Sequence, residues 1–394
     1  MPDEYPNAFE APLTASRLVF TAIGLLDTFT AEQRSAAVIP DFEDPRRTDW
    51  DIIPKPDRTG VSLHLLDRHQ KVLAWDLVRM CLPLRAFTKV LAITQLETVL
   101  RDFEQELLGP ALQAWRTPDS YFLTIFGRPG FEDTWSLRFL GHHVCVNITV
   151  VRERWVIATP MALGAQPVLY DGVLHPLRDD EGLAFDLLGE LNDAQRSTAI
   201  IHPVAPADFV TRQVPHIGEV EYGDLYDLGM LQYRITDADR EATKFERARP
   251  RGLCETEMNS AQRDILRSLL SCYLDRLPEE FRPASENWLK NLATDDVHFA
   301  WAGATVRGQA HYFRIQTPRF LIEAVNSVNN GNHLHTVLRD LDNDFGKSML
   351  ERPEFDRSVL REHLTTRTTS SIPYESDHSQ IPESSTTTSK ETRS

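Results

Sequence analysis

The stretch YFLTIFGRPGFEDTWSLRFLGHHVCVNITVVRERWVIATP, residues 121–160, alternates β-branched and aromatic residues with polar ones. Alternation of this kind is typical of strands, because successive side chains on a strand point to opposite faces of the sheet. Arg128-Pro129-Gly130 interrupts the pattern once, as a turn between two strands would. The stretch therefore predicts a block of antiparallel strands.

The segments around this block have the spacing of helices. Apolar residues recur at near-helical intervals between residues 64 and 108, which predicts two amphipathic helices there. The same spacing returns in two later segments, 178–200 and 258–277, and strand patterns follow at 297–326 and 333–338. Blocks of strands thus follow blocks of helices, whereas a parallel sheet would need single strands that alternate with single helices. An α+β fold is expected, with antiparallel strand blocks packed against amphipathic helices.

The order of helices, strands, helices and strands suggests an internal repeat. The segments GVSLHLLDRHQKVLAWDLV and GLCETEMNSAQRDILRSLL align without gaps and pair Gln70 with Gln262. Each segment precedes a strand block with a Thr-Pro step, Thr159-Pro160 in one block and Thr317-Pro318 in the other. Two interpretations stay open: the chain consists of two related halves, or two amphipathic helices resemble each other by pattern alone.

The composition changes abruptly near residue 365. The last thirty residues contain sixteen Ser or Thr and few apolar residues, too few to offset the entropy of ordering them. We expect an N-terminal extension with a lead-in helix at 1–44, a globular domain at 45–364 and a disordered Ser/Thr-rich tail at 365–394. If the domain is a repeat, its halves are expected at 45–205 and 206–364.

The composition also limits the classes of function. The formal net charge is −16 and no cluster of Lys or Arg offsets it, so nucleic-acid binding is not expected. The four cysteines lie far apart without a Cys-x-x-Cys pair, so they predict neither a zinc ribbon nor a disulfide framework. The sequence lacks a secretory signal, and its apolar runs are too short to cross a bilayer. We expect a soluble cytoplasmic protein, and its oligomeric state stays open.

The histidines of the predicted strands form two clusters. NHLHTVLRD contains His333 and His335 directly after the Asn-Gly step 330–331, which is a hairpin signal. Residues two apart on a strand share a face, so both imidazoles would reach one cavity. GHHVCVN contains His142 and His143, and strand alternation places His143 on the more polar face. This favours His143 as a metal ligand and His142 as a core neighbour, and the reverse assignment stays open.

His311, which opens the strand HYFRIQ, is a further candidate ligand. Three or four neutral imidazoles suit iron, copper, zinc or nickel, whereas calcium and magnesium prefer oxygen ligands. Iron or copper, which we expect ahead of zinc, would make the protein an oxidoreductase that acts on a small organic molecule. Zinc would make it a hydrolase. In a third interpretation the histidines are structural and the protein is a binding or scaffold protein.

Three further residues are candidates for the chemistry. Glu323 is a carboxylate between apolar residues, which makes it a ligand, a general base or an ion-pair partner for an arginine; the first two roles require that the hairpin turns it towards the histidines. If the residue numbers of each cross-strand pair add up to an even value, as for 323 with 337, Glu323 lies on the same face as the histidines. A two-residue turn would place it on the opposite face. Arg314 or Arg339 could anchor a substrate carboxylate through a bidentate contact.

Other chemistries lack their motifs. The sequence has no G-x-S-x-G elbow and no phosphate-binding glycine motif. The acidic run DLDNDFG at 340–346 lacks the glycine and glutamate of a calcium loop, so we expect a turn in which Asp344 holds Arg339.

Four blocks of the sequence resemble a known family. YFLTIFGRPG, WSLRFLGHHVCVN, HYFRIQTPRFLIEAVN and NHLHTVLRDLDNDFG are similar to the signature blocks of domain of unknown function family 3500. The resemblance covers roughly residues 45–350 and includes the two aligned helical segments. The family brings no catalytic residues with established roles. The resemblance does imply that the four histidines of the two clusters belong to a family pattern.

Overall fold

The computed structural model describes residues 10–113, 116–131, 133–218, 236–352 and 355. The chain divides into two compact units, 1–349 and 350–394. The first nine residues of the expected N-terminal extension and the expected disordered tail, 365–394, lie outside the described residues. The fold and the site below belong to the first unit.

Helices precede strands in each half of this unit. The first half runs through α1 (Pro12–Asp27), α2 (Ala31–Ala37), β1 (Val38–Ile39), β2 (Val61–Ser62), α3 (Arg68–Cys81), α4 (Leu84–Gln113), β3 (Tyr121–Phe126), β4 (Thr134–Gly141), β5 (Val144–Val151), β6 (Trp155–Ile157) and β7 (Met161–Ala165). The second half runs through α5 (Arg178–Glu190), α6 (Asp193–Ala199), β8 (Ile200–His202), α7 (Asp237–Thr243), β9 (Leu253–Cys254), α8 (Ser260–Leu274), α9 (Arg282–Asn291), β10 (His298–Gly303), β11 (His311–Gln316), β12 (Phe320–Asn326) and β13 (Leu334–Asp340), and α10 (Lys347–Leu350) follows.

A single sheet of 13 strands joins the two halves in the described part of the chain. Its strands lie in the order β1-β3-β4-β5-β7-β13-β12-β11-β10-β8, and β2, β6 and β9 pair with β3, β5 and β10. The pairs β1–β3 and β8–β10 are parallel, and the other pairs are antiparallel. The order is symmetric about the β7–β13 pair, where the two halves meet. The α+β fold class is confirmed.

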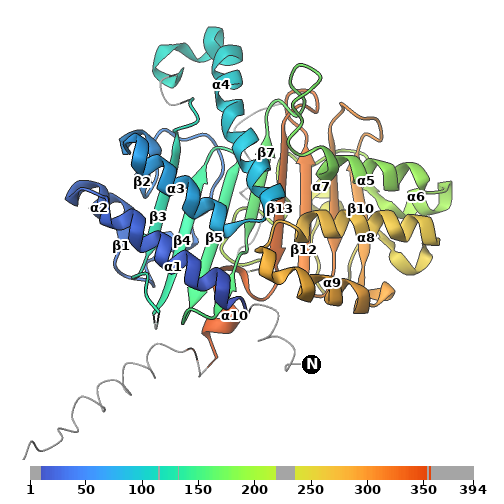
Figure 1. The fold of residues 1–394 in the computed structure, drawn as a ribbon. Helices are drawn as coiled ribbons and strands as arrows, with labels where there is room; N and C mark the ends of the chain where they lie inside the picture. The colour runs from blue at the N-terminus through green and yellow to red at the C-terminus, as the bar shows by residue number, and fades with distance from the viewer. Residues whose placement is uncertain (1–9, 114–115, 132, 219–235, 353–354, 356–394) are drawn as a thin grey trace, which may run out of the picture. The chain divides into compact units, whose positions relative to one another are not determined.

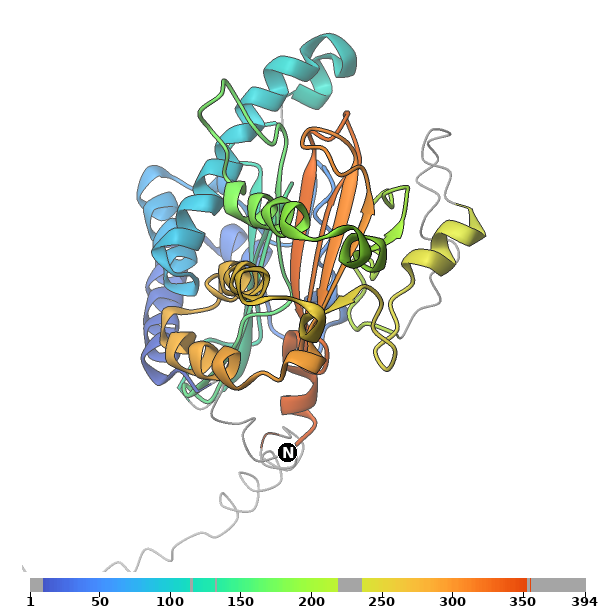
Figure 2. The same cartoon turned by 90° about the vertical axis from the view of Figure 1, so that its right-hand side faces the viewer.

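Helices cover one face of this sheet, as Figures 1 and 2 show for α1, α3, α4, α5, α8 and α9. The main hydrophobic core lies between them and the strands and includes Leu77, Leu269 and Ile322. The other face carries a smaller apolar cluster with Trp50, Phe209 and Tyr312, two of which come from segments outside helices and strands. Every helix in the described part of the chain is too short or too polar to span a bilayer.

The helices of the two halves begin in the same way. Asp67 caps α3 together with Gln70, and Asn259 caps α8 together with Gln262, each through reciprocal side-chain and backbone hydrogen bonds. The Gln70 amide donates to the Gln33 side chain at 2.9 Å, and the Gln262 amide makes the same bond, also 2.9 Å, to Gln195. Gln70 and Gln262 thus make the same contacts in the two halves, as two related halves would predict.

The strands follow the same correspondence. Arg138 lies opposite Asn147 in the β4–β5 hairpin, and Arg314 lies opposite Glu323 in the β11–β12 hairpin. Each strand block contains its Thr-Pro step, but the two steps do not occupy corresponding positions, because Thr159-Pro160 precedes β7 whereas Thr317-Pro318 lies between β11 and β12. A dipeptide is too short to identify corresponding positions. The repeated elements span 12–165 and 178–340, and the division into 45–205 and 206–364 stays a prediction.

A buried ion network lies where the halves meet. The Asp180 carboxylate of α5 accepts bonds of 2.6 Å from Lys89 Nζ of α4 and 2.6 Å from Arg276 Nη2, which follows α8. Arg276 Nη2 also donates to Thr336 Oγ1 of β13 at 2.9 Å. Burial alone would raise the pKa of Asp180, but the charges of Arg276 and Lys89 lower it. The network therefore ties helices of both halves to the central strands.

Candidate metal centre

Histidines from both halves meet beside the central β7–β13 pair. His142 and His143 form the turn between β4 and β5, whose ladder closes with the pair Gly141↔Val144. His333 directly precedes β13, and His335 lies within β13 opposite Gly164 of β7. Figure 1 shows β5, β7 and β13 side by side in the middle of the sheet.

The prediction that His142 and His143 lie in a strand, on opposite faces, was wrong. His143 has a positive φ of 64°, a turn conformation that strands do not use. The alternation on either side continues through the hairpin, so pattern alone did not reveal the two-residue turn. As turn residues, neither histidine has to take one of the two faces of a strand.

Backbone bonds and one glycine hold the His143 ring. Gly164 N donates to His143 O at 2.7 Å, and His143 N donates to Ile52 O at 3.1 Å. A Cβ atom on Gly164 would lie 3.0 Å from the His143 ring and 2.9 Å from the carbonyl oxygen of Leu334. Glycine at this position therefore leaves the space that the imidazole occupies.

The Nε2 atom of His333 is close to the Nε2 atoms of two other histidines. His143 Nε2 lies 2.7 Å from His333 Nε2, which lies 3.0 Å from His335 Nε2. The ring centroids of His143 and His335 are 5.0 Å apart. Nitrogens that bind one ion at about 2.0–2.1 Å lie roughly 2.9–3.4 Å from one another, so the two spacings are close to those of a shared ligand set.

His142 is the fourth imidazole of the cluster. Its ring lies against that of His143, with 3.6 Å between the centroids and a tilt of 31°. His142, His143 and His333 each offer a ligand atom, and these atoms all lie within 4.8 Å of one another. His142 is thus a neighbour of the three closest histidines. Of these three, His143 belongs to the first half of the chain, and His333 and His335 belong to the second.

Two carboxylates bind the far nitrogens of these rings. Asp208 Oδ1 lies 3.1 Å from His335 Nδ1, and Glu97 Oε1 of α4 lies 2.5 Å from His142 Nδ1. Arg116 reaches the same His142 nitrogen at 2.7 Å and forms an ion pair with Glu97 at 3.3 Å. The Asp208 carboxylate keeps the hydrogen of His335 on Nδ1, which leaves Nε2 with a free lone pair, whereas His142 Nδ1 faces both the acceptor Glu97 and the donor Arg116.

The electrostatics of the cluster favour neutral imidazoles. Burial lowers the pKa of His143 and of His333 well below the usual 6.5, and the neighbouring histidines lower both further. Burial also lowers the pKa of His142, although Glu97 opposes this change. Burial alone would raise the pKa of Glu97, but the charges of His142 and Arg116 lower it. Neutral rings with ionised partners are the protonation states that metal ligation requires.

His311 lies in a different environment from the four clustered histidines. Its ring stacks on Trp301 with 5.2 Å between the centroids, and its Nε2 lies 3.2 Å from Glu181 of α5. Its Nδ1 contacts the carbonyl oxygen of Gln309 at 2.8 Å. The structure therefore does not bring this candidate ligand to the convergent nitrogens.

Glu323 lies on the face that the even register requires, because it pairs with Val337 and His335 pairs with Val325. Its carboxylate is nevertheless occupied by other donors. Val210 N and Tyr312 Oη donate to Oε1 at 2.8 Å and 2.9 Å, and Thr211 donates to Oε2 through its hydroxyl. The contacts of Glu323 thus go to a covering loop and a neighbouring strand, and none of them is to a histidine.

The two candidate anchors for a substrate carboxylate hold backbone segments. Arg314 Nη1 donates to the carbonyl oxygen of Thr243 at 2.9 Å. Arg339 pairs with Asp344 at 2.6 Å, as the sequence predicted, and donates to the carbonyl oxygen of Val214 at 2.9 Å. Both side chains are about 1 % exposed or less, so neither faces an open cavity.

Sequence reasoning missed four residues around the histidines: Glu97, Arg116, Gly164 and Asp208. Glu97 did leave a signal, because it is a charged residue among the apolar positions of the predicted helix and follows Ile93 by one helical turn. The other three stand in segments without a pattern. Only their contacts with residues distant in the chain distinguish them.

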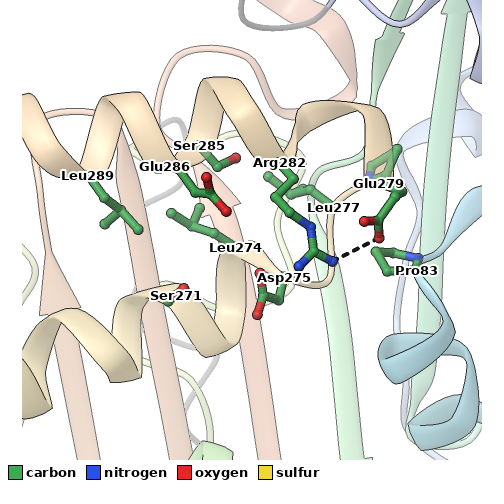
Figure 3. A pocket seen from close by; sticks show the side chains of 11 residues that line it. Pro83, Ser271, Leu274, Asp275, Leu277, Glu279, Arg282, Ser285, Glu286 and Leu289 are labelled. Atoms are coloured by element: carbon green, nitrogen blue, oxygen red, sulfur yellow. Dashed lines mark hydrogen bonds and ion pairs between the residues drawn. The ribbon is translucent and has the colours of Figure 1, made fainter.

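A small pocket lies far from this cluster in the chain. Figure 3 shows it between α8 and α9, with the Arg282–Glu279 ion pair of 2.9 Å at its edge. Its volume is about 10 Å³, which is room for one water molecule. It therefore does not compete with the histidine cluster as a site for an organic substrate.

A family model described as "Protein of unknown function (DUF3500)" matches residues 12–347. Because the match covers most of the chain, the protein belongs to this family. The match begins at the first residue of α1, takes in both halves and extends the resemblance of residues 45–350 towards the N-terminus. Neither a curated protein nor a solved structure matches the chain.

Proposed function

We propose that this member of the DUF3500 family binds one first-row transition-metal ion and is an oxidoreductase that acts on a small organic molecule. The ligands are His143, His333 and His335, with His142 as a fourth imidazole beside them. The observation that carries the proposal is the approach of three Nε2 atoms to 2.7 Å and 3.0 Å.

Hydrogen bonds account poorly for this approach. An imidazole nitrogen has either one hydrogen or one lone pair, so His333 Nε2 cannot satisfy two neighbouring nitrogens equally well. His333 Nδ1 is buried and has no hydrogen-bond partner among the described residues. An ion at the convergence point would take one lone pair from each Nε2 atom and remove the conflict.

The surroundings of the rings support the same proposal. Asp208 on His335 and Glu97 on His142 are carboxylates in the outer position that usually orients metal-binding histidines. Such partners hold each ring by its Nδ1 and increase the basicity of the Nε2 atom. A histidine with a purely structural role does not need a buried carboxylate at its Nδ1 atom, because burying a charge costs free energy.

The donor set bears on the choice of ion. Both carboxylates of the cluster bind Nδ1 atoms, so the ligands are nitrogens without the carboxylate that iron shares with two histidines in many oxygenases. Nitrogen ligands bind copper most strongly in the divalent series. We therefore favour copper over iron. A bound copper ion would supply one-electron redox chemistry.

The second candidate is a zinc-dependent hydrolase. It is supported by the number of ligands, because three histidines with an open position are a common arrangement at catalytic zinc ions. His333 and His335 are partly exposed, whereas His143 is 1 % exposed. A small molecule would thus approach the ion from the side of the β12–β13 turn in either case.

Elemental analysis of the purified protein tests the proposal. We expect about one copper or zinc ion per chain, and we expect it to be lost in a folded His333→Ala/His335→Ala variant. His311→Ala is the matched control, because this buried histidine of the same sheet lies outside the cluster; it should retain the metal. Circular dichroism checks the fold of all three proteins.

The identity of the ion separates the two candidates. A copper(II) paramagnetic resonance spectrum with nitrogen hyperfine splitting would support the oxidoreductase, and a stoichiometric, spectroscopically silent zinc ion would support the hydrolase. A wild-type protein that retains none of copper, zinc or iron after reconstitution would overturn the metal site and favour a binding or scaffold protein with structural histidines.

A further inference from the structure

We infer that Glu323 is a positioning residue of the histidine centre, which it reaches through a loop and through Asp208. The loop consists of residues 207–214, here named the 207–214 strap, and it lies on the sheet face opposite the helices. The inference deepens the proposed function and rests on it in one respect, that His335 is a metal ligand.

The 207–214 strap contains no helix or strand, so its backbone groups need other partners. Glu323 supplies them in the middle of the strap. Its Oε1 accepts from Val210 N at 2.8 Å, and its Oε2 accepts from Thr211 N at 3.2 Å and from the Thr211 hydroxyl. Tyr312 Oη donates to the same carboxylate at 2.9 Å, so the group is held from the sheet side as well.

The strap carries Asp208 at its histidine end. Asp208 is two residues before Val210, and its Oδ1 both contacts His335 Nδ1 at 3.1 Å and accepts from Phe209 N at 2.8 Å. The Phe209 ring lies 5.9 Å from the His335 ring. Because the Glu323 bonds begin at Val210, they determine where the backbone presents the Asp208 carboxylate to the imidazole.

Burial makes Glu323 a strong anchor. The residue is 0 % exposed, and its carboxylate accepts from Val210 N, from Thr211 and from Tyr312 Oη. A carboxylate accepts several such bonds, whereas a glutamine at the same place would turn its own N–H groups towards at least one of them. Glu323→Gln should therefore displace the strap without a change in the volume of the side chain.

The first test measures the tautomer of the His335 ring in the metal-free protein. Nitrogen-15 spectra of histidine-labelled protein, assigned by comparison with His335→Gln, report which ring nitrogen carries the hydrogen. We expect hydrogen on Nδ1 in the wild-type protein and a shift towards the Nε2–H form in Glu323→Gln. A folded Glu323→Gln protein with the wild-type His335 tautomer would overturn the inference.

Glu255→Gln is the matched control. Glu255 is also a buried glutamate, 1 % exposed, and its carboxylate accepts from Arg267 at 2.6 Å; its side-chain bonds among the described residues do not involve the strap. We expect this variant to keep the wild-type His335 tautomer. If Glu255→Gln changed the tautomer as much as Glu323→Gln does, the effect would be one of general stability, which would also overturn the inference.

The second test measures the dissociation constant of Zn²⁺ against a chromophoric chelator. Loss of an outer partner of a ligand weakens binding by roughly 10- to 100-fold, and we expect at least about 10-fold in Glu323→Gln and no more than about twofold in Glu255→Gln. Because Glu323 acts through Asp208, Asp208→Asn/Glu323→Gln should bind no more weakly than Asp208→Asn. An equal further loss in the double variant would overturn the inference.

The two tests separate the inference from the proposed function. A tautomer change in Glu323→Gln together with a wild-type protein that binds none of Zn²⁺, copper or iron would refute the metal site and leave the positioning role intact. Zn²⁺ binding that Glu323→Gln does not alter would refute the positioning role alone. Should Glu323→Gln not fold, Thr211→Val removes one donor to the carboxylate at nearly constant volume, and the same results are expected of it.

Discussion

The β4–β5 turn and the β11–β12 turn occupy corresponding places in the two halves. In the first, Gly164 N donates to the carbonyl oxygen of His143 at 2.7 Å; in the second, Leu341 N donates to that of Arg319 at 2.8 Å. The backbone bond is thus repeated, but the side chains differ. Arg319 forms an ion pair with Asp340 at 3.1 Å, whereas His143 faces other imidazoles. The repeat determines the scaffold, and of these two corresponding turns only the β4–β5 turn contributes a histidine to the candidate site.

The neighbouring strand differs in the same sense. Gly164 has no side chain because the His143 ring fills the adjacent space, whereas its counterpart Leu341 keeps one. An ion pair satisfies its two charges by itself, but convergent imidazoles leave lone pairs without a partner. We conclude that the β4–β5 turn, whose imidazoles have lone pairs without a partner, is the candidate for function. The ion-paired β11–β12 turn is structural.

The largest effect on stability is expected from a substitution that breaks the ion network between the two halves. Asp180→Asn leaves Lys89 and Arg276 buried without a counter-charge, and we expect it to lower the free energy of unfolding by about 3–5 kcal/mol. Asp186→Asn on the same helix is the control: its ion pair with Arg307 is more than half exposed on both sides and should cost less than about 1 kcal/mol. Urea unfolding measures both, and similar losses would contradict this account.

The next effect compares the two turns directly. His143→Ala removes one of three proposed ligands and should weaken metal binding by about 100-fold, since each ligand of a zinc site contributes roughly 3 kcal/mol. Arg319→Ala removes the corresponding side chain of the other half and should leave metal binding unchanged. Chelator competition measures both affinities. Equal losses in the two variants would mean that metal binding reports the fold rather than the histidine turn.

The two ends of the sheet should also respond differently to pH in the metal-free protein. Burial lowers the pKa of His143 and His333 well below 6.5, so the unfolded chain binds more protons and stability falls as the pH drops below 6.5. Burial raises the pKa of Asp344 from 3.8 to about 6, so its contribution falls as the pH rises through that range. Each group changes the stability by at most about 1.4 kcal/mol per pH unit.

A series of urea unfolding curves between pH 5 and pH 8 tests these signs. A His143→Gln/His333→Gln variant cannot bind the two protons, so it should lose less stability than the wild-type protein below pH 6.5. Parallel curves for the two proteins would show that these histidines keep ordinary pKa values in the folded state.

The smallest effect concerns contacts that the halves share. Gln70→Ala and Gln262→Ala remove the same capping bonds and the same amide pair, so each should cost about 1–2 kcal/mol and the two costs should be alike. Thermal or urea unfolding measures them. A large difference between the two variants would show that the repeated contacts no longer have equivalent surroundings.

Much of the fold could be predicted from short-range patterns. Alternation and helical spacing identified the strand and helix blocks, because buried and exposed faces impose those periods on neighbouring residues. The Asn-Gly step predicted the β12–β13 hairpin, and the register placed Glu323 on the histidine side. His333 and His335 lie close together because they are two residues apart in the sequence.

The rest depended on contacts between distant segments. The turn at His142 and His143 interrupts an alternation that continues on both sides, so periodicity could not locate it. Arg314 and Arg339 looked free to bind a substrate, but each donates to backbone carbonyls about 70 or 125 residues away in the chain. Buried charges find partners wherever the fold brings an acceptor, and no local pattern announces that acceptor.

By itself, then, the sequence determined the α+β class and the candidate histidines, and it offered the repeat marked by Gln70 and Gln262 as one of two interpretations. Only the tertiary structure decided that His143 joins His333 and His335, that His311 does not, and that Asp208 and Glu97 hold the outer nitrogens. The physical reason is that secondary structure follows from the alternation of neighbours, whereas a site needs atoms from several segments within about 3 Å of one another. Such distances exist only once the β7–β13 pair has joined the strands of the two halves into one sheet.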